Sequence, residues 1–433
     1  MAAIDPVLRS RLCFSPIRVV WPPWADLPPG QPADASCAVA QASGLTRFLR
    51  DEAIMRLVHV SLADCMLRDL TCLAALRLAT RLRTLDLARN GLPPVALARL
   101  ADFLRASSLT ALDLSGNRLG DGGLELHDYL SRQDKSAAKV TPFWTFAEAV
   151  RDAHLERLEL RDNMLRNADL AAFLAPLKSA KPSLSALGLA GNSLSSEVAA
   201  LVDCPRLTTL DLSHCPIRSE VSFLSEELAK RGTLTALSLA GTDLTTGSVS
   251  SVARIISQVK VLSLARCGLT PGVSFSLIMR AALHEASPLE VFDISGNDFT
   301  CKGTSEIGRE LAGNSSLRVL RLAYCKLLWS SAKDARIMAD KSTLSSEEFA
   351  AVDELRLGLV RSVVRELDVE GNELAPYAVA ALTRGLPLEV LSLKQNPIGD
   401  AYCAELSRKG LLALSLSEAE ISSVGAAAIG PSP

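Results

Sequence analysis

Aliphatic residues recur along this chain with one fixed spacing of apolar and polar positions. The spacing is apolar-x-x-apolar-x-apolar-x-x-Asn/Cys-x-apolar, and it is cleanest at 82–92 and 109–119. It returns thirteen times, from the copy that begins at Leu57 to the copy that begins at Leu411. Self-similarity at a period of about 20 to 50 residues is the signature of a stacked array of repeats. The pattern therefore predicts a solenoid, which grows along one axis and needs no single central core.

Each copy predicts one short strand followed by one helix. The fourth and sixth motif positions are apolar and point inward, whereas the third, fifth and seventh face out, because side chains alternate along a strand. The segments between motifs show helical spacing, as in 94–105 and in 218–232, where Gly232 predicts the helix end. Strands about 4.8 Å apart would give thirteen copies a strand-lined face roughly 60 Å long.

Two gaps between copies of the motif are longer than the others. Most copies begin 23 to 30 residues apart, but two gaps span 46 and 47 residues. We predict insertions near 131–146 and 328–361, and a degenerate repeat hidden in each gap is the alternative. The second insertion contains Ser345-Ser-Glu-Glu348, a capping-box match, followed by a helical apolar stripe at Phe349, Val352, Leu355 and Leu359. Insertions on a solenoid gather on one face and often serve binding.

Residues 1–56 differ from the repeats. The segment 20–30 is too rich in proline for a helix or a central strand. Residues 44–57 predict an amphipathic helix that covers the open core of the first repeat, since a terminal repeat needs a cap. The predicted organisation is therefore a Pro/Trp-rich segment and capping helix over 1–56, and a repeat domain of about thirteen repeats over 57–430.

The turns that lead into helices add a further signal, carried by Asn117-Arg-Leu-Gly-Asp-Gly-Gly123, Asn396-Pro-Ile-Gly-Asp400 and Gly268-Leu-Thr-Pro-Gly272. With its thirteen motifs the chain resembles the leucine-rich repeat proteins, and these turns resemble their ribonuclease-inhibitor type. The resemblance covers about residues 57–430. It implies an α/β fold, a horseshoe-shaped leucine-rich repeat solenoid with an inner parallel sheet and outer helices. It also implies that the concave face binds other proteins.

Charge and hydropathy narrow the classes of partner. The 46 basic and 48 acidic residues are nearly balanced, with no polybasic run, so we expect neither direct nucleic-acid binding nor an anionic membrane partner. The apolar residues recur at repeat positions and no 18-residue stretch lacks charges, which predicts no membrane span. The N-terminus has no secretory-type apolar segment, and its three arginines leave a mitochondrial presequence as a less favoured alternative.

Cysteines replace asparagine at the ninth motif position in four copies, at Cys65, Cys215, Cys267 and Cys325. Asparagine satisfies buried backbone groups there, and cysteine is a small residue that is readily buried. The ten cysteines show no C-x-x-C metal spacing, and without an export signal we expect reduced thiols. The structural interpretation is therefore favoured over a metal site.

A search for catalytic chemistry finds little. No two of the five histidines share a metal-ligand spacing, and no Walker loop or G-x-S-x-G motif occurs. We therefore predict no enzyme, no cofactor, no metal and no small-molecule substrate.

The outward-facing strand positions and the tryptophans supply the candidate binding residues. Most outward positions are small, but large charges gather in the fourth and eleventh copies, and all four tryptophans lie outside the motifs. The alternatives are a solvated charged face and tryptophans that anchor their own irregular segments. The predicted protein-binding residues are Trp21, Trp24, Phe143, Trp144, Trp329, Arg157, Glu159, Arg161, Arg321, Glu366, Asp368 and Glu370.

Together these features predict a non-enzymatic intracellular scaffold that binds proteins through its concave face and two insertions. In broad organisation it resembles the repeat subunits of axonemal regulatory complexes, which implies a subunit of a large cytoskeletal or ciliary assembly in the cytoplasm, cytoskeleton, cilium or flagellum. One alternative is a subunit of an organelle assembly such as a mitochondrial ribosome. Another is a GTPase-activating regulator of the Ran type, although the acidic tail of those proteins has no counterpart in this sequence.

Overall fold

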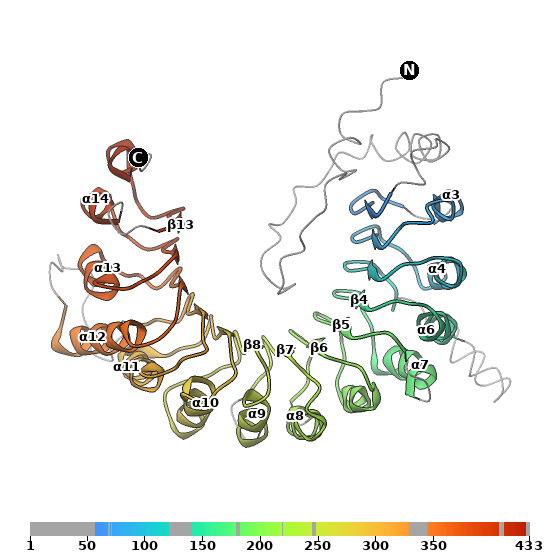
Figure 1. Ribbon diagram of the computed structural model, residues 1–433, viewed down its shortest axis with the longest axis horizontal. Coiled ribbons are helices and arrows are strands. Elements are labelled where there is room, and N and C mark those ends of the chain that lie inside the picture. The colour runs from blue at the N-terminus through green and yellow to red at the C-terminus, as the bar shows by residue number, and fades with distance from the viewer. Residues whose placement is uncertain are drawn as a thin grey trace. The chain divides into compact units, whose positions relative to one another are not determined.

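The computed structural model describes residues 57–67, 70, 72–120, 141–178, 182–218, 220–244, 248–328, 344–406 and 411–429. The chain falls into two compact units, Met1–Glu220 and Val221–Pro433, which we describe separately. In each unit one three-residue strand comes from each repeat, and strands that follow one another in sequence lie side by side in parallel. Helices form a second layer along the strands (Figure 1).

The first unit alternates strands with helices of differing length. Its strands are β1 (His59–Ser61), β2 (Thr84–Asp86), β3 (Ala111–Asp113), β4 (Arg157–Glu159), β5 (Ala186–Gly188) and β6 (Thr209–Asp211). Its described helices are α3 (Cys72–Leu76), α4 (Ala96–Arg105), α6 (Pro142–Asp152), α7 (Asn167–Lys178) and the 3-10 helix η3 (Ser196–Asp203).

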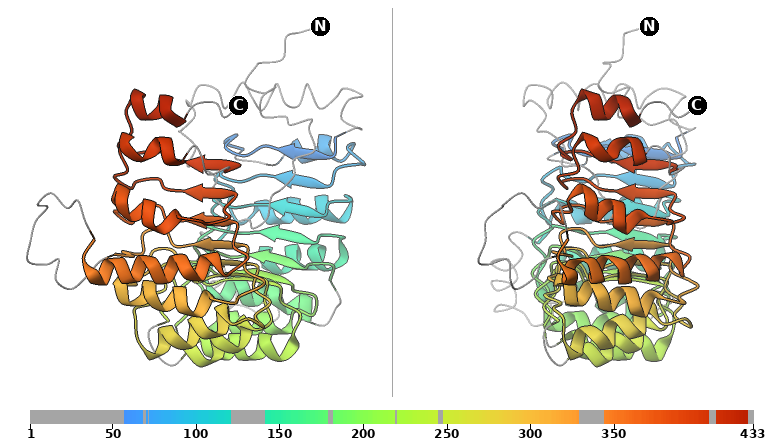
Figure 2. Two further views of the ribbon diagram at one scale, coloured as in Figure 1. Left: turned by 60° about the vertical axis from the view of Figure 1, so that its left-hand side comes forward. Right: turned by 90° about the vertical axis from the view of Figure 1, so that its left-hand side faces the viewer.

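The second unit repeats this arrangement, with its helices stacked in one layer beside the strands (Figure 2). Its strands are β7 (Ala236–Ser238), β8 (Val261–Ser263), β9 (Val291–Asp293), β10 (Val319–Arg321), β11 (Glu366–Asp368), β12 (Val390–Ser392) and β13 (Ala413–Ser415). Its helices are α8 (Glu220–Arg231), α9 (Val249–Ile256), α10 (Val273–Leu283), α11 (Thr300–Leu311), α12 (Ser346–Val360), α13 (Pro376–Thr383), η5 (Asp400–Tyr402), α14 (Cys403–Leu406) and α15 (Ser423–Ile429).

The strand positions confirm the repeat pattern. Every strand occupies the third to fifth positions of a predicted motif, so the apolar residue at the fourth position points into the core. Leu210 and Leu212, at the fourth and sixth positions of one copy, are both 0% exposed. The helices at 94–105 and 218–232 are confirmed as α4 and α8, and Gly232 follows α8 with a left-handed backbone (φ 62°).

In the residues that the structure describes, the two long gaps add no strand to the sheet. β3 pairs directly with β4, and β10 pairs directly with β11, so no strand lies between the members of either pair. No described strand therefore comes from a degenerate repeat in either gap. α6 and α12 pack beside the neighbouring helices of their units, and each takes the place of a repeat helix. Much of the predicted insertion at 131–146, and residues 329–343 of the other, lie outside the described residues.

α12 begins with the predicted capping box. The Ser345 backbone N–H donates to Glu348 Oε2 at 2.8 Å, and the Glu348 N–H donates to Ser345 Oγ at 3.2 Å. Val352 and Leu355 are buried as predicted, but Phe349 is 57% exposed. The apolar stripe of this helix therefore begins at Val352, one turn later than the sequence indicates.

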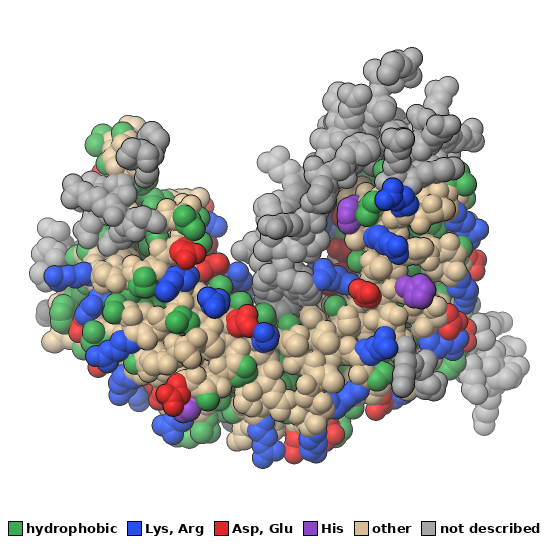
Figure 3. Space-filling view, viewed as in Figure 1, with side chains coloured by type: hydrophobic (Ala, Val, Ile, Leu, Met, Phe, Trp, Pro, Cys, Tyr) green, Lys and Arg blue, Asp and Glu red, His purple; other side chains and the backbone are tan. Residues whose placement is uncertain are grey.

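Charges of both signs are interspersed on the described surface visible in Figure 3, with no large area of one sign. The near balance of the composition thus holds locally as well. In the residues that the structure describes, no helix is long and apolar enough to cross a membrane.

A left-handed residue ends each strand segment. The eighth motif position has a positive φ in all thirteen copies, from Asp64 (φ 55°) to Glu418 (φ 58°), and five of these residues are glycine. Most residues other than glycine avoid this conformation, so the turn is fixed by the stacking around it. The turn brings the ninth residue in beneath the end of the sheet.

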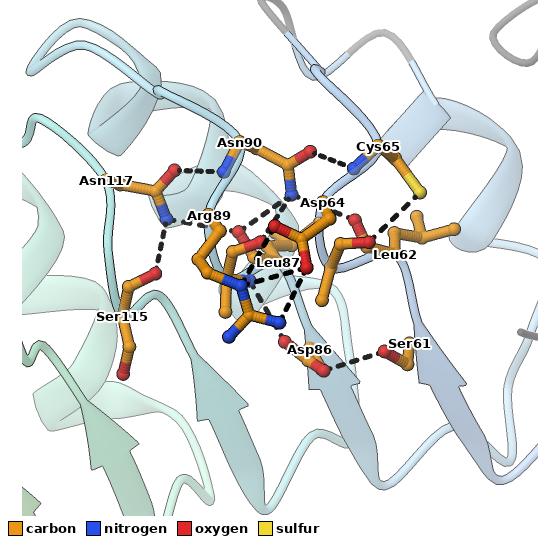
Figure 4. A network of polar contacts seen from close by, with 12 residues as sticks. Ser61, Leu62, Asp64, Cys65, Asp86, Leu87, Arg89, Asn90, Ser115 and Asn117 are labelled. Carbon is orange, nitrogen blue, oxygen red and sulfur yellow. Dashed lines mark hydrogen bonds and ion pairs between the residues drawn. The ribbon is translucent and has the colours of Figure 1, made fainter. Parts of the chain in front are cut away.

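The ninth residue joins neighbouring repeats through hydrogen bonds to backbone groups (Figure 4). Asn90 Oδ1 accepts from the N–H groups of Cys65 and Leu67 at 3.0 Å each, and Asn90 Nδ2 donates to the carbonyl oxygens of Leu62 and Leu87 at 2.9 Å each. One amide thus satisfies four buried backbone groups in two successive repeats. This bonding explains why asparagine recurs at intervals of one repeat.

Cysteine fills the same place in other repeats. The Sγ atoms of Cys215 and Cys267 donate to the carbonyl oxygens of Leu189 and Leu239 in the preceding repeat, at 3.3 and 3.1 Å. Burial raises the pKa of both thiols to about 12, so they stay protonated. No disulfide joins the cysteines of the described segments. The predicted structural role of these cysteines is confirmed.

Candidate protein-binding face

The strand face consists of the side chains at the third, fifth and seventh motif positions, which point away from the helix layer. The structure places Arg157 and Glu159 on β4 and Arg161 just after it, all half-buried on this face. On the second unit it places Glu366 and Asp368 on β11, with Arg321 on the neighbouring strand β10. The charged candidates therefore form one group in each unit.

The group on the first unit, which we call the β4 charge cluster, comprises Asp113, Arg157, Glu159, Arg161 and Asp211. Strand register sets Asp113 beside Glu159, and Gly188 lies on the other side of Glu159. Gly188 has no side chain, and the carboxylate of Glu159 fills the space that a Cβ would need there. On β6, the strand after β5, Asp211 Oδ2 lies 3.2 Å from Arg161 Nη2.

Burial disfavours the ionised form of the carboxylates in this cluster. It raises the pKa of Glu159 to about 8, and the carboxylates of Asp113 and Asp211 add to that rise. Arg157 and Arg161 oppose the rise, because their positive charge favours the ionised carboxylate. A partner cation placed on this face would act in the same direction as the two arginines. The chemistry of the cluster therefore suits a basic side chain of a partner.

Asp211 differs from its expected exposure. The alternation pattern predicts an outward-facing, solvated side chain, but Asp211 is only 4% exposed. Its Oδ1 accepts from the N–H and the hydroxyl of Ser213 at 2.9 and 2.5 Å, while Arg161 covers its other oxygen. The side chain does lie on the strand face, and neighbouring side chains cover it there.

The group on the second unit, which we call the β11 charge cluster, consists of Arg321, Tyr324, Glu366, Asp368, Glu370 and Lys394. Arg321 Nη2 lies 3.7 Å from Glu366 Oε1, and Lys394 Nζ lies 3.8 Å from Glu370 Oε2. The Tyr324 hydroxyl donates to Glu370 Oε1 at 2.7 Å, and this hydrogen bond is the main reason that the pKa of Tyr324 rises to about 12. The cluster therefore presents a tyrosine among paired charges.

Sequence reasoning missed Tyr324. Its side chain is 44% exposed and lies over Gly371 of the next repeat, where a Cβ would meet the ring. The available signal was an aromatic residue at the eighth motif position, which is glycine or polar in all other copies. Tyrosine is enriched at protein interfaces because it combines a large apolar area with a polar group.

The aromatic candidates do not join the charge clusters. Phe143 lies on α6, is only 3% exposed and faces the core, so the prediction that it contacts a partner is wrong. Its position one residue after the start of the helix turns it inward. Trp144 is half-buried on α6, in the helix layer. Trp21, Trp24 and Trp329 lie outside the described residues.

The described segments hold no group of three histidine, cysteine or acidic side chains arranged to bind a metal ion. His59, on the strand face, has its Nδ1 2.7 Å from Thr84 Oγ1, which gives the ring a structural partner.

Comparison with known proteins agrees with the repeat architecture. A family model for the leucine-rich repeat matches residues 105–126 and 203–220, which include β3 and β6. The chain is a leucine-rich repeat protein. Its fold is the predicted α/β solenoid, in which parallel strands alternate with helices. Leucine-rich repeats of this stacked kind form extended surfaces for protein–protein interaction, so the partners are expected to be proteins.

Several individual proteins are similar to this leucine-rich repeat chain. Protein CARMIL of Dictyostelium discoideum is 23% identical over 348 residues, which cover 70% of this chain and 33% of that protein. The chain thus spans about a third of the length of this relative.

Solved structures match this chain at low sequence identity. A chain in the crystal structure of the Rad7 and Elc1 complex in yeast matches with a TM-score of 0.51 at 16% identity, over 90% of this chain and 83% of that chain. An internalin of Listeria monocytogenes matches with a TM-score of 0.42 at 14% identity, over 90% of this chain and 92% of that chain.

Proposed function

We propose that this leucine-rich repeat protein is a non-enzymatic scaffold that binds protein partners through its strand faces, as a subunit of a cytoskeletal assembly. The observation that carries the proposal is the β4 charge cluster, where partly buried carboxylates and arginines lie on a face that otherwise consists mainly of small side chains. A face of small side chains with a few fixed charges is suited to the recognition of another protein.

Small side chains allow a partner to approach the strands closely. The seventh motif position is small in five of the six copies of the first unit, at Ala63, Ala88, Ser115, Ala190 and Ser213. Their small volume leaves the backbone of the strands close to the surface. A helix or loop of a partner can then reach the carboxylates at the fifth position, which lie among them.

The carboxylates favour a basic group on the partner. Burial raises the pKa of Asp113, and the neighbouring carboxylate of Asp86 raises it further. Asp86, Asp113 and Glu159 stand on three successive paired strands, in one row across the sheet. A lysine or arginine of the partner placed along this row would relieve repulsion among the three acids, whereas Arg157 would meet an acidic neighbour.

The cytoskeletal setting rests on less direct support. Its basis is that leucine-rich repeat proteins of the ribonuclease-inhibitor type are common in cytoskeletal and ciliary complexes. The partial likeness to Protein CARMIL is the comparison that supports it. An organelle assembly would use the same surface, so the experiment must identify the partners.

The test is affinity capture of the tagged protein from cells that express it naturally, with a charge reversal at each of two aspartates. Asp113→Lys reverses one carboxylate of the β4 charge cluster, and Asp102→Lys makes the same change on the exposed face of α4. We expect cytoskeletal proteins to be enriched with the wild type and with Asp102→Lys, and to fall at least about tenfold with Asp113→Lys, because the new cation repels the basic group of the partner; this fall corresponds to about 1.4 kcal/mol of binding energy.

Different outcomes contradict different parts of the proposal. Equal capture by the two variants would mean that the strand face of the first unit does not bind the partner. Enrichment of mitochondrial ribosomal proteins would overturn the cytoskeletal setting but keep the scaffold. A captured small GTPase whose hydrolysis of GTP accelerates with the purified protein would favour a regulator.

A further inference from the structure

In the helix layer of the second unit, α12 lies between α11 and α13 (Figure 1). It packs more extensively against α11 than against α13. On the α11 side, a Cβ on Gly358 would overlap the carbonyl oxygen of Gly308, so the backbones of the two helices approach each other directly. The capping box of Ser345 and Glu348 fixes the first turn of α12. The helix is therefore held in place from its α11 side.

On its other side a groove separates α12 from α13. We call it the α12–α13 groove, and it is lined by Phe349, Val352, Asp353, Arg356, Ala381 and Arg384. Its floor is apolar, because Val352 is 3% exposed and the half-buried Ala381 of α13 has only a methyl side chain. The ring of Phe349, 57% exposed, forms one wall.

The groove has room for one large apolar side chain. It encloses about 180 Å³. A cavity of about 150 Å³ in a protein core is large enough to bind benzene. Because the ring of Phe349 is available for an edge-to-face or offset contact, an aromatic side chain suits this space better than an aliphatic one.

The charged residues of the groove leave one positive charge unbalanced. The Nε and Nη2 atoms of Arg356 donate to Asp353 Oδ1 at 3.1 and 2.7 Å, so these two charges neutralise each other. Arg384 is exposed beside them, and within the described part of the chain no side chain forms an ion pair with it. A guanidinium group at the rim of an apolar groove favours a carboxylate on the occupant.

We propose that the α12–α13 groove binds an acidic segment of a partner protein that carries one aromatic side chain. The aromatic ring enters the groove against Phe349, Val352 and Ala381. A carboxylate next to it in the partner sequence pairs with Arg384, in the two-pronged geometry that guanidinium groups and carboxylates share. The groove is thus a second interaction surface, in the helix layer and separate from the strand faces.

The two kinds of surface select opposite charges. The carboxylates of the β4 charge cluster favour a basic group, whereas Arg384 favours an acidic one. A segment that fits the groove would be repelled by those carboxylates. We therefore expect the groove to hold a different segment from the one that binds the strand face, so each surface can be tested without the other.

Saturation-transfer difference NMR of the purified full chain tests the groove. The probe is a capped short peptide in which one phenylalanine lies between two aspartates, with serine and glycine on both sides. We expect its ring protons to be saturated by the protein, with a dissociation constant of about 0.1–1 mM, because one side chain and one ion pair make the contact. The same peptide with alanine in place of phenylalanine should bind at least about tenfold more weakly.

Variants of the protein assign the binding to the groove. Arg384→Glu should raise the dissociation constant of the acidic peptide at least about threefold, because repulsion replaces attraction. Ala381→Leu should raise it at least about tenfold by filling the groove. Arg309→Glu is the matched control, since Arg309 is exposed in the last turn of α11, on the other side of α12, and it should leave the constant unchanged.

A charge exchange separates recognition from damage to the fold. A peptide with lysines in place of both aspartates should bind the wild type more weakly than the acidic peptide and bind Arg384→Glu more tightly. Equal effects of Arg384→Glu and Arg309→Glu, or equal binding of the two peptides to the wild type, would overturn the proposal. So would a wild type that leaves the ring unsaturated, because the groove is then empty or holds a second copy or a segment of this chain.

Discussion

Replacing Asn117 by alanine should destabilise the first unit far more than its size suggests. Asn117 Oδ1 accepts from the N–H groups of Asn90 and Leu92 at 3.0 Å each. Its Nδ2 donates to the carbonyl oxygens of Leu114 and Leu87 at 2.7 and 3.1 Å. Alanine would leave these groups buried without their partner. Each unsatisfied buried group costs about 1–3 kcal/mol, so the two N–H groups alone predict a loss of about 2–6 kcal/mol.

Urea denaturation followed by circular dichroism measures this loss as a shift in midpoint. Asp102→Ala is the control, because Asp102 is exposed on α4 and makes only a surface ion pair with Arg105 at 3.4 Å, which is worth less than about 1 kcal/mol. Asn117→Cys should fall between the two, since cysteine fills the same position in four other repeats. If Asn117→Ala shifts the midpoint no more than Asp102→Ala does, the ninth-position hydrogen bonds do not hold the repeats together.

Three further predictions concern the core and the β4 charge cluster. Leu212→Ala should cost about 2–5 kcal/mol in urea denaturation, because Leu212 is 0% exposed, and a loss below about 1 kcal/mol would contradict its core position. Asp211→Ala should cost about 1–3 kcal/mol through its lost hydrogen bonds with Ser213, and a neutral result would contradict its burial. The folded-state pKa of Glu159, about 8, lies above its ordinary value of 4.5, so its stabilising contribution is complete below pH 4.5 and is lost as pH rises through 8. Glu159→Gln should remove this fall between about pH 5 and about pH 9, and midpoints that change with pH equally in both proteins would contradict it.

The strands could be predicted from the sequence because their signal is local and repeated. A leucine at the fourth position must point inward wherever the sixth is also apolar, and thirteen copies of that pattern leave little ambiguity. The structural role of the asparagines and cysteines at the ninth position could also be predicted. Asn90 and Cys215 each donate a hydrogen bond to a buried carbonyl of the preceding repeat. These features depend only on the repeat period.

The candidate site was less predictable because it depends on side chains from different repeats. Asp211 is buried by Arg161, which lies 50 residues earlier in sequence, and strand alternation alone cannot show such cover. Phe143 looked like part of an irregular insertion, but it lies in α6 and faces the core. Tyr324 belongs to the β11 charge cluster because its hydroxyl contacts Glu370. These two residues lie in neighbouring copies of the motif, which begin 47 residues apart in the sequence.

Hydrogen–deuterium exchange of the protein with its captured partner tests the strand-face proposal most directly. The account predicts slower exchange, on addition of the partner, in the residues on and just after β4 or β11, where the two charge clusters lie. Exchange in the exposed turns of the helix layer beside α4 and α7 should stay unchanged. Protection confined to the helix layer, with both charge clusters unaffected, would contradict binding through the strand faces.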